Sequence, residues 1–167
     1  MSPAPFRVEP LSGLLDRTSF DSGSEPLDRY FEQQVTQDVR RRVTSCFIAV
    51  DKNQQIAGYY TLASTSVVLS DLPAAIVKKL PRYPSVPAVR MGRLAVDKRF
   101  KGKGLGGALL ADALARACNA EIAAFALVVD AKDESASRFY RHHGFIGFSE
   151  APLAFFLPLA TARAQIA

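Results

Sequence analysis

Apolar positions recur along the chain with two periods, and the period predicts where helices and strands lie. Spacings of three and four residues predict helices, and short runs rich in aromatic and β-branched residues predict strands. The predicted elements are a helix over 26–41, strands over 44–50 and 55–66 joined by a hairpin turn at 51–54, a short helix over 73–80, a strand over 89–96, a helix from Leu105, a strand over 123–130, a helix over 133–143, and strands over 145–148 and 153–159. With one strand before the first helix, the order β-α-β-β-α-β-α-β-α-β-β predicts an α/β fold within a single domain, 1–167.

Two of these segments are apolar at almost every position. The helix from Leu105 is rich in alanine and carries Asp112, Arg116 and Asn119 as one narrow polar stripe, so we expect it to be largely buried. The strand over 123–130 has the composition of a central strand that is covered on both faces.

The composition is that of a globular protein and indicates no membrane span. Of 167 residues, 49% are hydrophobic and 22% are charged, which suffices for one domain with a core. Residues 1–10 lack the features of a signal peptide, and no run approaches the roughly 20 apolar residues of a membrane helix, so we expect a cytoplasmic protein. Cys46 and Cys118 are far apart and have no nearby histidine, which favours buried thiols over a disulfide or a metal site.

The formal net charge of +5 favours an anionic partner, although a nucleotide cofactor accounts for part of it. The basic residues form four clusters: Arg40, Arg41 and Arg42; Lys78, Lys79 and Arg82; Arg90 and Arg93; and Lys98, Arg99, Lys101 and Lys103. A single cluster is usually a solvated face, but four in a small domain predict an extended positive surface.

A glycine-rich turn links the strand over 89–96 to the alanine-rich helix. It has the pattern Arg99-x-x-Gly102-x-Gly104, and the helix begins at about Leu105. Several backbone N–H groups and a helix amino terminus then converge, which is an arrangement that binds phosphate. Glycines let the phosphate oxygens approach the amides, and Lys101 and Lys103 add positive charge. The alternative is a plain left-handed turn with surface lysines.

The sequence does not match two other phosphate-binding motifs. A P-loop ends in Gly-Lys-Ser/Thr, whereas Gly104 is followed by Leu105, and the dinucleotide-binding fingerprint opens the first βα unit. The turn instead resembles the one that follows the fourth strand in the GNAT superfamily of N-acetyltransferases, written Arg/Gln-x-x-Gly-x-Gly/Ala. The resemblance covers essentially the whole chain and implies a central, mixed, mostly antiparallel sheet of about seven strands flanked by about four helices.

The resemblance implies acetyl-CoA as the cofactor, with coenzyme A as the product. The cofactor-binding residues that it implies are Leu94, Ala95, Val96, Arg99, Lys101, Gly102, Lys103, Gly104, Leu105, Gly106, Gly107, Ser135, Phe139 and Tyr140. In this family, backbone groups of the fourth strand, here about 94–96, meet the oxyanion and the amide arm of the cofactor.

A second motif, Phe139-Tyr140-Arg141-His142-His143-Gly144-Phe145, resembles the late signature of the family, and Ala136 also matches. The resemblance implies that Tyr140 lies beside the cofactor sulfur as the catalytic residue that protonates the leaving thiolate. The alternative is a tyrosine that only packs in the core. The chain departs from the family at Asp133, where relatives often carry an asparagine that contacts the pantetheine arm, so that contact is not assigned.

His142 and His143 end the same predicted helix, two and three residues past Tyr140. This position favours capping of the helix end over a role as general base. No feature of the sequence identifies a base, and an α-amino group with a pKa of about 8 needs none beyond water.

Within the superfamily, the chain is most similar to the toxin acetyltransferases of bacterial toxin–antitoxin pairs. The similarity rests on the segments Phe20–Gly23, Gly58–Leu62, Leu80–Pro84, Gly92–Asp97 and Phe156–Leu159, with Ser22 in place of a frequent cysteine. It implies acetylation of the amino acid on charged tRNA, which blocks translation, together with a ribbon-helix-helix antitoxin as partner and a homodimer.

Such a substrate is a polyanion, which fits the basic clusters. The predicted tRNA-binding residues are Arg40, Arg41, Arg42, Lys78, Lys79, Arg82, Arg90 and Arg93. Arg93 is the sharpest candidate because it precedes the cofactor-binding part of its strand, although a structural ion pair is an equal alternative.

Two other functions remain open at this point. One is an acetyltransferase for a small-molecule or protein amine, in which the basic clusters serve solubility and cofactor steering. The other is a non-catalytic module that binds acetyl-CoA.

Overall fold

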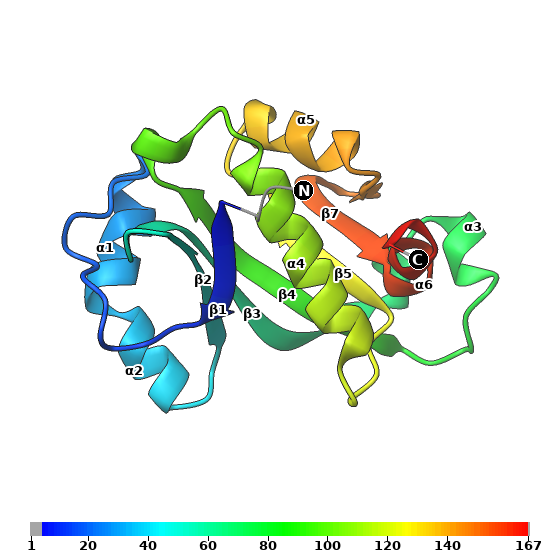
Figure 1. The fold of residues 1–167 in the computed structure, drawn as a ribbon. Helices are drawn as coiled ribbons and strands as arrows, with labels where there is room; N and C mark the ends of the chain where they lie inside the picture. Colours follow the sequence, from blue (N-terminus) through cyan, green and yellow to red (C-terminus); the bar gives the residue numbers. More distant parts are fainter. Residues whose placement is uncertain (1–4, 167) are drawn as a thin grey trace. The chain divides into compact units, whose positions relative to one another are not determined.

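A computed structural model describes residues 5–166, and its strands form one seven-stranded sheet in the order β1-β2-β3-β4-β5-β7-β6 (Figure 1). The strands are β1 Phe6–Pro10, β2 Ser45–Asp51, β3 Ile56–Val68, β4 Ser85–Val96, β5 Ala126–Asp130, β6 Ile146–Phe148 and β7 Ala151–Pro158. The helices are α1 Glu25–Gln33, α2 Val35–Arg40, α3 Ala74–Val77, α4 Leu105–Asn119, α5 Glu134–His142 and α6 Leu159–Ile166, with 3₁₀ turns η1 Leu69–Asp71 and η2 Lys98–Phe100. β4 and β5 pair in parallel, while β1–β2, β2–β3, β5–β7 and β6–β7 are antiparallel, so the predicted mixed, mostly antiparallel sheet is confirmed.

The chain divides into two compact units, and each has its own core. Unit 1 comprises the residues up to Ala63 together with Gly92–Ala113, and unit 2 comprises Ser64–Met91 and the residues from Leu114 on. The core of unit 1 includes Phe31 of α1, whose ring stacks on Tyr59 of β3 with centroids 4.2 Å apart. Because Tyr59 is fully buried, its hydroxyl needs a partner, and it donates a hydrogen bond to the carbonyl of Leu27 at 2.7 Å.

The helix predicted over 26–41 is two helices. The chain breaks between α1 and α2 at Gln34, where φ is −120° and ψ is −32°. The apolar positions Phe31 and Val35 keep the four-residue spacing across the break and are both fully buried. The sequence pattern is therefore the same for one straight helix and for two that meet at an angle, and it could not reveal the break.

Gly58 of β3 marks a close approach inside unit 1. A Cβ at this position would lie 2.8 Å from the carbonyl oxygen of Ala95 on β4 and 2.8 Å from Cδ1 of Leu109 on α4. These distances leave no room for a side chain. The glycine therefore lets the first turns of α4 pack directly onto the strands, which fixes where that helix begins.

The core of unit 2 surrounds β5, which is buried from Ala126 to Val129, as predicted for a central strand. β4 begins at Ser85, four residues earlier than predicted, although it contains Pro87. Proline lacks an N–H group, but Pro87 is exposed and its carbonyl accepts a hydrogen bond from the amide of Phe125 at 2.8 Å. A proline at this position is thus compatible with the strand.

The helix α6 was not predicted. It follows β7 without a loop, and its apolar residues continue those of the strand, so no change in pattern separates the two. The one sequence signal was Pro158 directly before an alanine-rich segment, which is typical of a helix start. The predicted helix over 73–80 is likewise shorter, with α3 covering Ala74–Val77.

Candidate active site

The glycine turn lies in unit 1 and leads from η2 into α4. Gly102 and Gly104 have φ angles of +82° and +77°, in the left-handed region that favours glycine. Among the described residues, no atom lies within 4 Å of the position that a Cβ would take at either glycine. The turn is therefore open on that side, and its conformation fits the predicted phosphate cradle at a helix amino terminus.

The residues that flank the turn differ in exposure. Leu105 is buried, whereas Gly106 and Gly107 in the first turn of α4 are partly buried. On β4, Ala95 is buried between the half-buried Leu94 and Val96. The amide of Asp97, at the end of this strand, donates to the carbonyl of Ala57 at 2.8 Å, which fixes the direction in which the chain enters the turn.

Asp97 is a buried carboxylate that ties the turn to a distant loop. Its side chain is 1% exposed, and it accepts hydrogen bonds from the amide of Asp21 at 3.0 Å and from the amide of Arg99 at 2.9 Å. The guanidinium of Arg99 adds two more bonds, Nε to Oδ1 at 3.0 Å and Nη2 to Oδ2 at 3.2 Å. Burial alone would raise the pKa of Asp97, but these bonds outweigh it and lower the pKa below its ordinary value.

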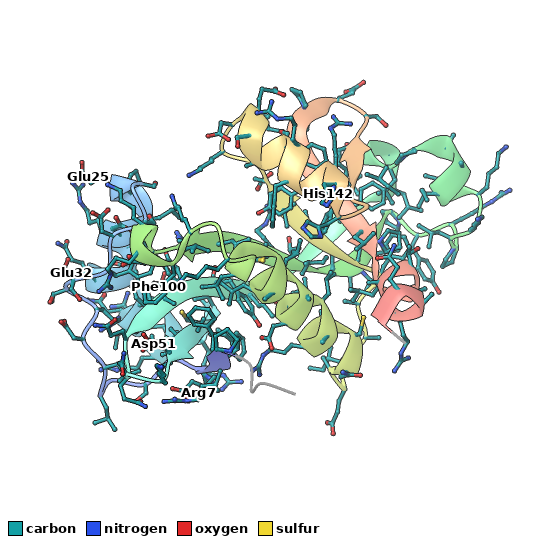
Figure 2. The ribbon with its side chains drawn as sticks, turned by 45° about the horizontal axis from the view of Figure 1, so that its top comes forward. Arg7, Glu25, Glu32, Asp51, Phe100 and His142 are labelled. Atoms are coloured by element: carbon teal, nitrogen blue, oxygen red, sulfur yellow. The ribbon has the colours of Figure 1, made fainter. Side chains whose placement is uncertain are left out.

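The side chain of Arg99 is thus engaged within the protein, and so is that of Lys101. Nζ of Lys101 donates to the carbonyl of Ser22 at 2.8 Å, which holds the loop over 20–23 against the turn. Lys103 is exposed, with its ammonium 5.6 Å from the centroid of the Phe100 ring. Phe100, which is labelled in Figure 2, packs edge-on against Phe6. Asp97 had no predicted role, and its position directly before the turn was the only signal in the sequence.

Arg93 lies on β4 before the turn, and it stacks on an aromatic ring. Its guanidinium carbon is 3.4 Å from the ring centroid of Tyr30 on α1, which is a cation–π contact. The Tyr30 hydroxyl donates to Asp38 at 2.7 Å, and this bond is the main cause that lowers the pKa of Asp38. Among residues 5–166 no carboxylate lies within ion-pair distance of Arg93, so the alternative of a structural ion pair does not hold there.

Tyr140 belongs to unit 2 and lies on α5 with 6% of its surface exposed. Its ring contacts those of Phe139, Phe145 and Phe155, with centroids 5.3, 5.5 and 6.4 Å away. Burial, with a smaller contribution from the charge of Asp130, raises the pKa of Tyr140 to about 12. The phenol therefore keeps its proton at neutral pH, as a proton donor must.

The start of α5 explains the departure from the family pattern at Asp133. This residue is the N-cap, and its carboxylate accepts a hydrogen bond from the amide of Ala136 at 2.9 Å. Asparagine and aspartate cap helices about equally well, so the exchange preserves the helix start. Ser135 is exposed on the first turn, and Phe139 is half-buried one residue before Tyr140.

The two histidines lie at the carboxy-terminal end of α5, as predicted, and Figure 2 labels the first of them, His142. The ring of His143 packs edge-on against Phe139 at 4.8 Å, and burial lowers the pKa of His143. Gly144 then ends the helix with a φ of +89°.

The other predicted tRNA contacts form two sets, one in each unit. Arg40, Arg41 and Arg42 are exposed in succession at the end of α2 in unit 1. Lys78, Lys79 and Arg82 are exposed just after α3 in unit 2. Arg90 differs from these, because it forms an ion pair with Asp130 on the neighbouring strand β5.

Within residues 5–166, no helix has the length and apolar character needed to cross a membrane. Nor does this part of the chain contain a group of three or more His, Cys, Asp or Glu side chains placed to hold a metal ion.

Residues 19–153 match the acetyltransferase (GNAT) domain family, and the chain belongs to that family. The predicted class of enzyme is thereby confirmed. The chain is 35% identical over 165 residues to a tRNA-acetylating toxin of Mycobacterium tuberculosis (strain ATCC 25618 / H37Rv), with 98% of this chain and 96% of the relative covered.

Solved structures of one toxin, AtaT, show the same fold. AtaT complexed with acetyl-methionyl-tRNAfMet has a TM-score of 0.90 and 29% identity, covering 97% of this chain and 99% of the other. A tyrosine-to-phenylalanine mutant of AtaT, bound to the C-terminus of the antitoxin AtaR and to acetyl-CoA, has a TM-score of 0.82 and 25% identity, covering 98% and 99%. The predicted GNAT fold is confirmed.

Proposed function

We propose that this chain transfers the acetyl group of acetyl-CoA to the α-amino group of the amino acid on charged tRNA, and that it acts as a toxin by blocking translation. The observation that carries the proposal is its similarity, over nearly all of both chains, to AtaT bound to acetyl-methionyl-tRNAfMet and to a tRNA-acetylating toxin. The open glycine turn and the buried phenol are the two features of the chain that this reaction requires.

The turn fits the diphosphate of the cofactor. Side chains at Gly102 and Gly104 would occupy the open space above the amides, and the left-handed conformation of both residues favours glycine there. The amides of the turn and of the first turn of α4 bind the phosphate oxygens, and the exposed Lys103 adds positive charge. Backbone groups of 94–96 bind the amide arm and the carbonyl oxygen that becomes negative.

Bound acetyl-CoA supplies the thioester whose carbonyl carbon the neutral amine attacks. Tyr140 holds a proton at its hydroxyl, gives it to the sulfur as the C–S bond breaks, and recovers one from the nitrogen of the product. A pKa of about 12 supports this role, because the phenol is fully protonated when the thiolate leaves and strongly attracts a proton afterwards. Arg99 and Lys101 act on the shape of the turn through Asp97 and Ser22.

The tRNA contributes phosphates, and each unit of the chain offers basic residues for them. Arg40, Arg41 and Arg42 in unit 1 and Lys78, Lys79 and Arg82 in unit 2 are exposed and bind the phosphates without reading sequence. Arg93 is held by Tyr30 so that its guanidinium plane is preorganised for the terminal nucleotide of the tRNA.

The toxin assignment extends to partners. We infer a ribbon-helix-helix antitoxin that neutralises the enzyme, a homodimer, and action in the cytoplasm, where charged tRNA is found. The binding of AtaT to the C-terminus of the antitoxin AtaR supports an antitoxin as partner.

Mass spectrometry tests the proposed reaction. Bulk charged tRNA is incubated with the purified protein and isotope-labelled acetyl-CoA, and the aminoacyl groups are released and analysed. The expected result is label on the α-nitrogen of one or more amino acids. Label on peptide or polyamine amines, offered in the same reaction, with none on the aminoacyl groups would refute the tRNA assignment.

A further inference from the structure

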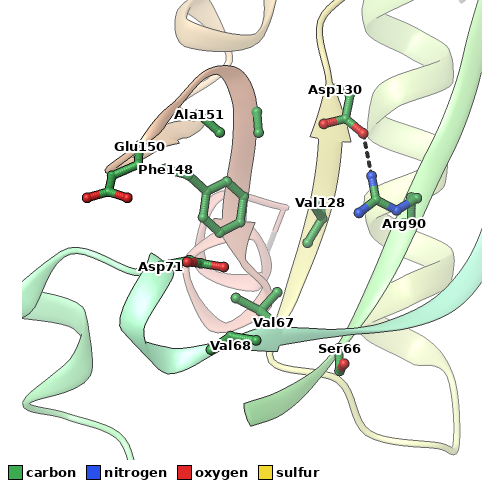
Figure 3. Close-up of a pocket in the computed structure, with 11 residues that line it drawn as sticks. Ser66, Val67, Val68, Asp71, Arg90, Val128, Asp130, Phe148, Glu150 and Ala151 are labelled. Atoms are coloured by element: carbon green, nitrogen blue, oxygen red, sulfur yellow. Dashed lines mark hydrogen bonds and ion pairs between the residues drawn. The ribbon is translucent and has the colours of Figure 1, made fainter. Parts of the chain in front are cut away.

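A cavity of about 430 Å³ opens in unit 2, and its volume lies in the range of small-molecule sites (Figure 3). One part of its wall is apolar. Val67 and Val128 are buried there, and Phe148 packs against Phe156 with ring centroids 5.0 Å apart. This part of the wall is well packed and is therefore preformed for an apolar group.

The rest of the lining is charged. Arg90 and Asp130 form the ion pair drawn in Figure 3, and Asp71 and Glu150 also line the cavity. Three carboxylates and one guanidinium give a net charge of −2. Since Arg90 and Asp130 neutralise each other, Asp71 and Glu150 set the sign of the potential in the cavity.

The cavity and Tyr140 lie on opposite faces of the same pair of strands. Ala154 of β7 lines the cavity, whereas the next residue, Phe155, contacts the ring of Tyr140, and successive side chains of a strand point to opposite faces. Asp130, at the end of β5, belongs to the cavity, and its charge also acts on Tyr140. Both sites therefore lie near the carboxyl end of β5, on opposite faces of the strands.

Direct transfer requires donor and acceptor to reach one point from different sides. A phenol that protonates the leaving thiolate lies on the side of the donor, which leaves the opposite face for the acceptor. We propose that this cavity receives the side chain of the amino acid being acetylated, and that Asp71 and Glu150 make it select neutral or cationic side chains against aspartate and glutamate. The inference rests on the proposed function and names the specificity of that site.

The experiment varies the amino acid while it keeps the RNA constant. One tRNA body is charged chemically with glycine, methionine, glutamine, lysine or glutamate, and kcat/KM for acetylation is measured for each. Glutamate is expected to react at least about tenfold more slowly than the best neutral substrate, because its carboxylate would approach two like charges. Equal rates for glutamate and the best neutral substrate would overturn the inference.

Variants link the preference to the cavity. Asp71→Asn combined with Glu150→Gln is expected to raise the rate for glutamate severalfold relative to glutamine, whereas the matched control Glu121→Gln, at an exposed residue outside the cavity, leaves the ratio unchanged. Asp71 and Glu150 are exposed, so these changes preserve the fold. A ratio that does not move in the double variant would also overturn the inference.

Size gives a second readout. Val68 lines the cavity with 49% of its surface exposed, so Val68→Phe narrows the cavity at little cost to the core. This variant is expected to lower kcat/KM for methionyl-tRNA several times more than for glycyl-tRNA. An equal decrease for both substrates would contradict the proposed occupant. If no amino acid is acetylated by the unaltered protein, the proposed function itself fails, which is distinct from acetylation with a specificity that the cavity does not control.

Discussion

The glycine turn of unit 1 and the region around α5 in unit 2 differ in what their chemistry depends on: the backbone in the turn and side chains around α5. In the turn, Gly102 and Gly104 leave open space where side chains would lie, while Arg99 and Lys101 are engaged by Asp97 and Ser22. In the α5 region, the chemistry depends on side chains, chiefly the phenol of Tyr140 and the charged groups that line the cavity. Function in the turn should therefore depend mainly on backbone conformation, whereas function around α5 should depend on the identity of the side chains.

Tyr140→Phe, which removes one oxygen, tests the second half of this contrast. We expect kcat to fall by about 10²–10⁴-fold, as is usual for loss of a proton donor, while the Kd for coenzyme A changes less than about twofold. Single-turnover acetylation and calorimetry measure the two quantities. Tyr83→Phe, at a residue that is 64% exposed, is the matched control. If kcat of the Tyr140 variant stayed within threefold of the unaltered enzyme, Tyr140 would be only a packing residue.

The pH dependence of the rate also tests whether Tyr140 is the proton donor. Because the pKa of Tyr140 is raised to about 12, its reactive, protonated form persists as the pH increases. The rate should rise with the deprotonation of an amine whose ordinary pKa is about 8, and then remain level to pH 10. Initial rates, corrected for spontaneous hydrolysis of the ester, give the profile. A descending limb centred below pH 10 would show that some other group donates the proton.

Gly104→Val tests the first half of the contrast. A β-branched residue at a φ of +77° is strained, and its side chain would enter the open space above the amides. We expect the Kd for coenzyme A to rise about 100-fold by calorimetry, with a folded protein because the turn is exposed. Lys103→Ala in the same turn should raise Kd only a fewfold, in a salt-dependent manner. A larger increase in Kd for Lys103→Ala than for Gly104→Val would show that side-chain charge matters more in the turn than backbone conformation.

Arg93→Ala should have an intermediate effect on tRNA binding. Loss of the stacked guanidinium is expected to weaken the affinity for charged tRNA about tenfold and to leave the Kd for coenzyme A unchanged. Filter binding at several salt concentrations measures this, with Arg163→Ala, at an exposed residue of α6, as the control. Equal losses in the two variants would mean that Arg93 contributes only to overall charge.

Asp97→Asn should affect stability more than chemistry. An amide cannot accept all the hydrogen bonds that the carboxylate accepts, so we expect a loss of about 1–3 kcal/mol in the free energy of unfolding at pH 7. Because the folded pKa of Asp97 is lowered, its stabilisation is present above the unfolded value of about 3.9 and disappears as the pH falls through the folded pKa. Urea titrations should therefore show a difference in the free energy of unfolding between the two proteins at pH 7, and this difference should shrink as the pH falls through the lowered folded pKa of Asp97. A difference in the free energy of unfolding that persists at acid pH would mean that the variant loses packing rather than hydrogen bonds to a carboxylate.

The sequence predicted the elements whose periodicity is strong and local. The order of strands, the buried β5 and the turn before α4 were all read correctly, because alternation, an apolar run and paired glycines each leave a mark within a few residues. The break at Gln34 and the helix α6 were missed, because the apolar pattern continues across both.

The candidate site shows the same division. Gly102, Gly104 and Tyr140 were identified from short motifs, and their assigned roles remain predictions. The contacts of Arg93 with Tyr30 and of Arg90 with Asp130 join residues more than 35 positions apart, and no local pattern encodes such pairs. The cavity is still less visible in the sequence, since its lining comes from five strands and two connecting segments.

The bonds of Asp97 bear on how genetic screens of such a protein are interpreted. If the chain is toxic as proposed, a selection for surviving cells records every mutation that inactivates it, whatever the cause. Asp97 resembles a catalytic acid because it is buried, ionised and next to the glycine turn, yet the four hydrogen bonds of its carboxylate go to Asp21 and Arg99. Survivors with substitutions of Asp97 would report a destabilised fold, and they should be counted separately from those with substitutions of Tyr140.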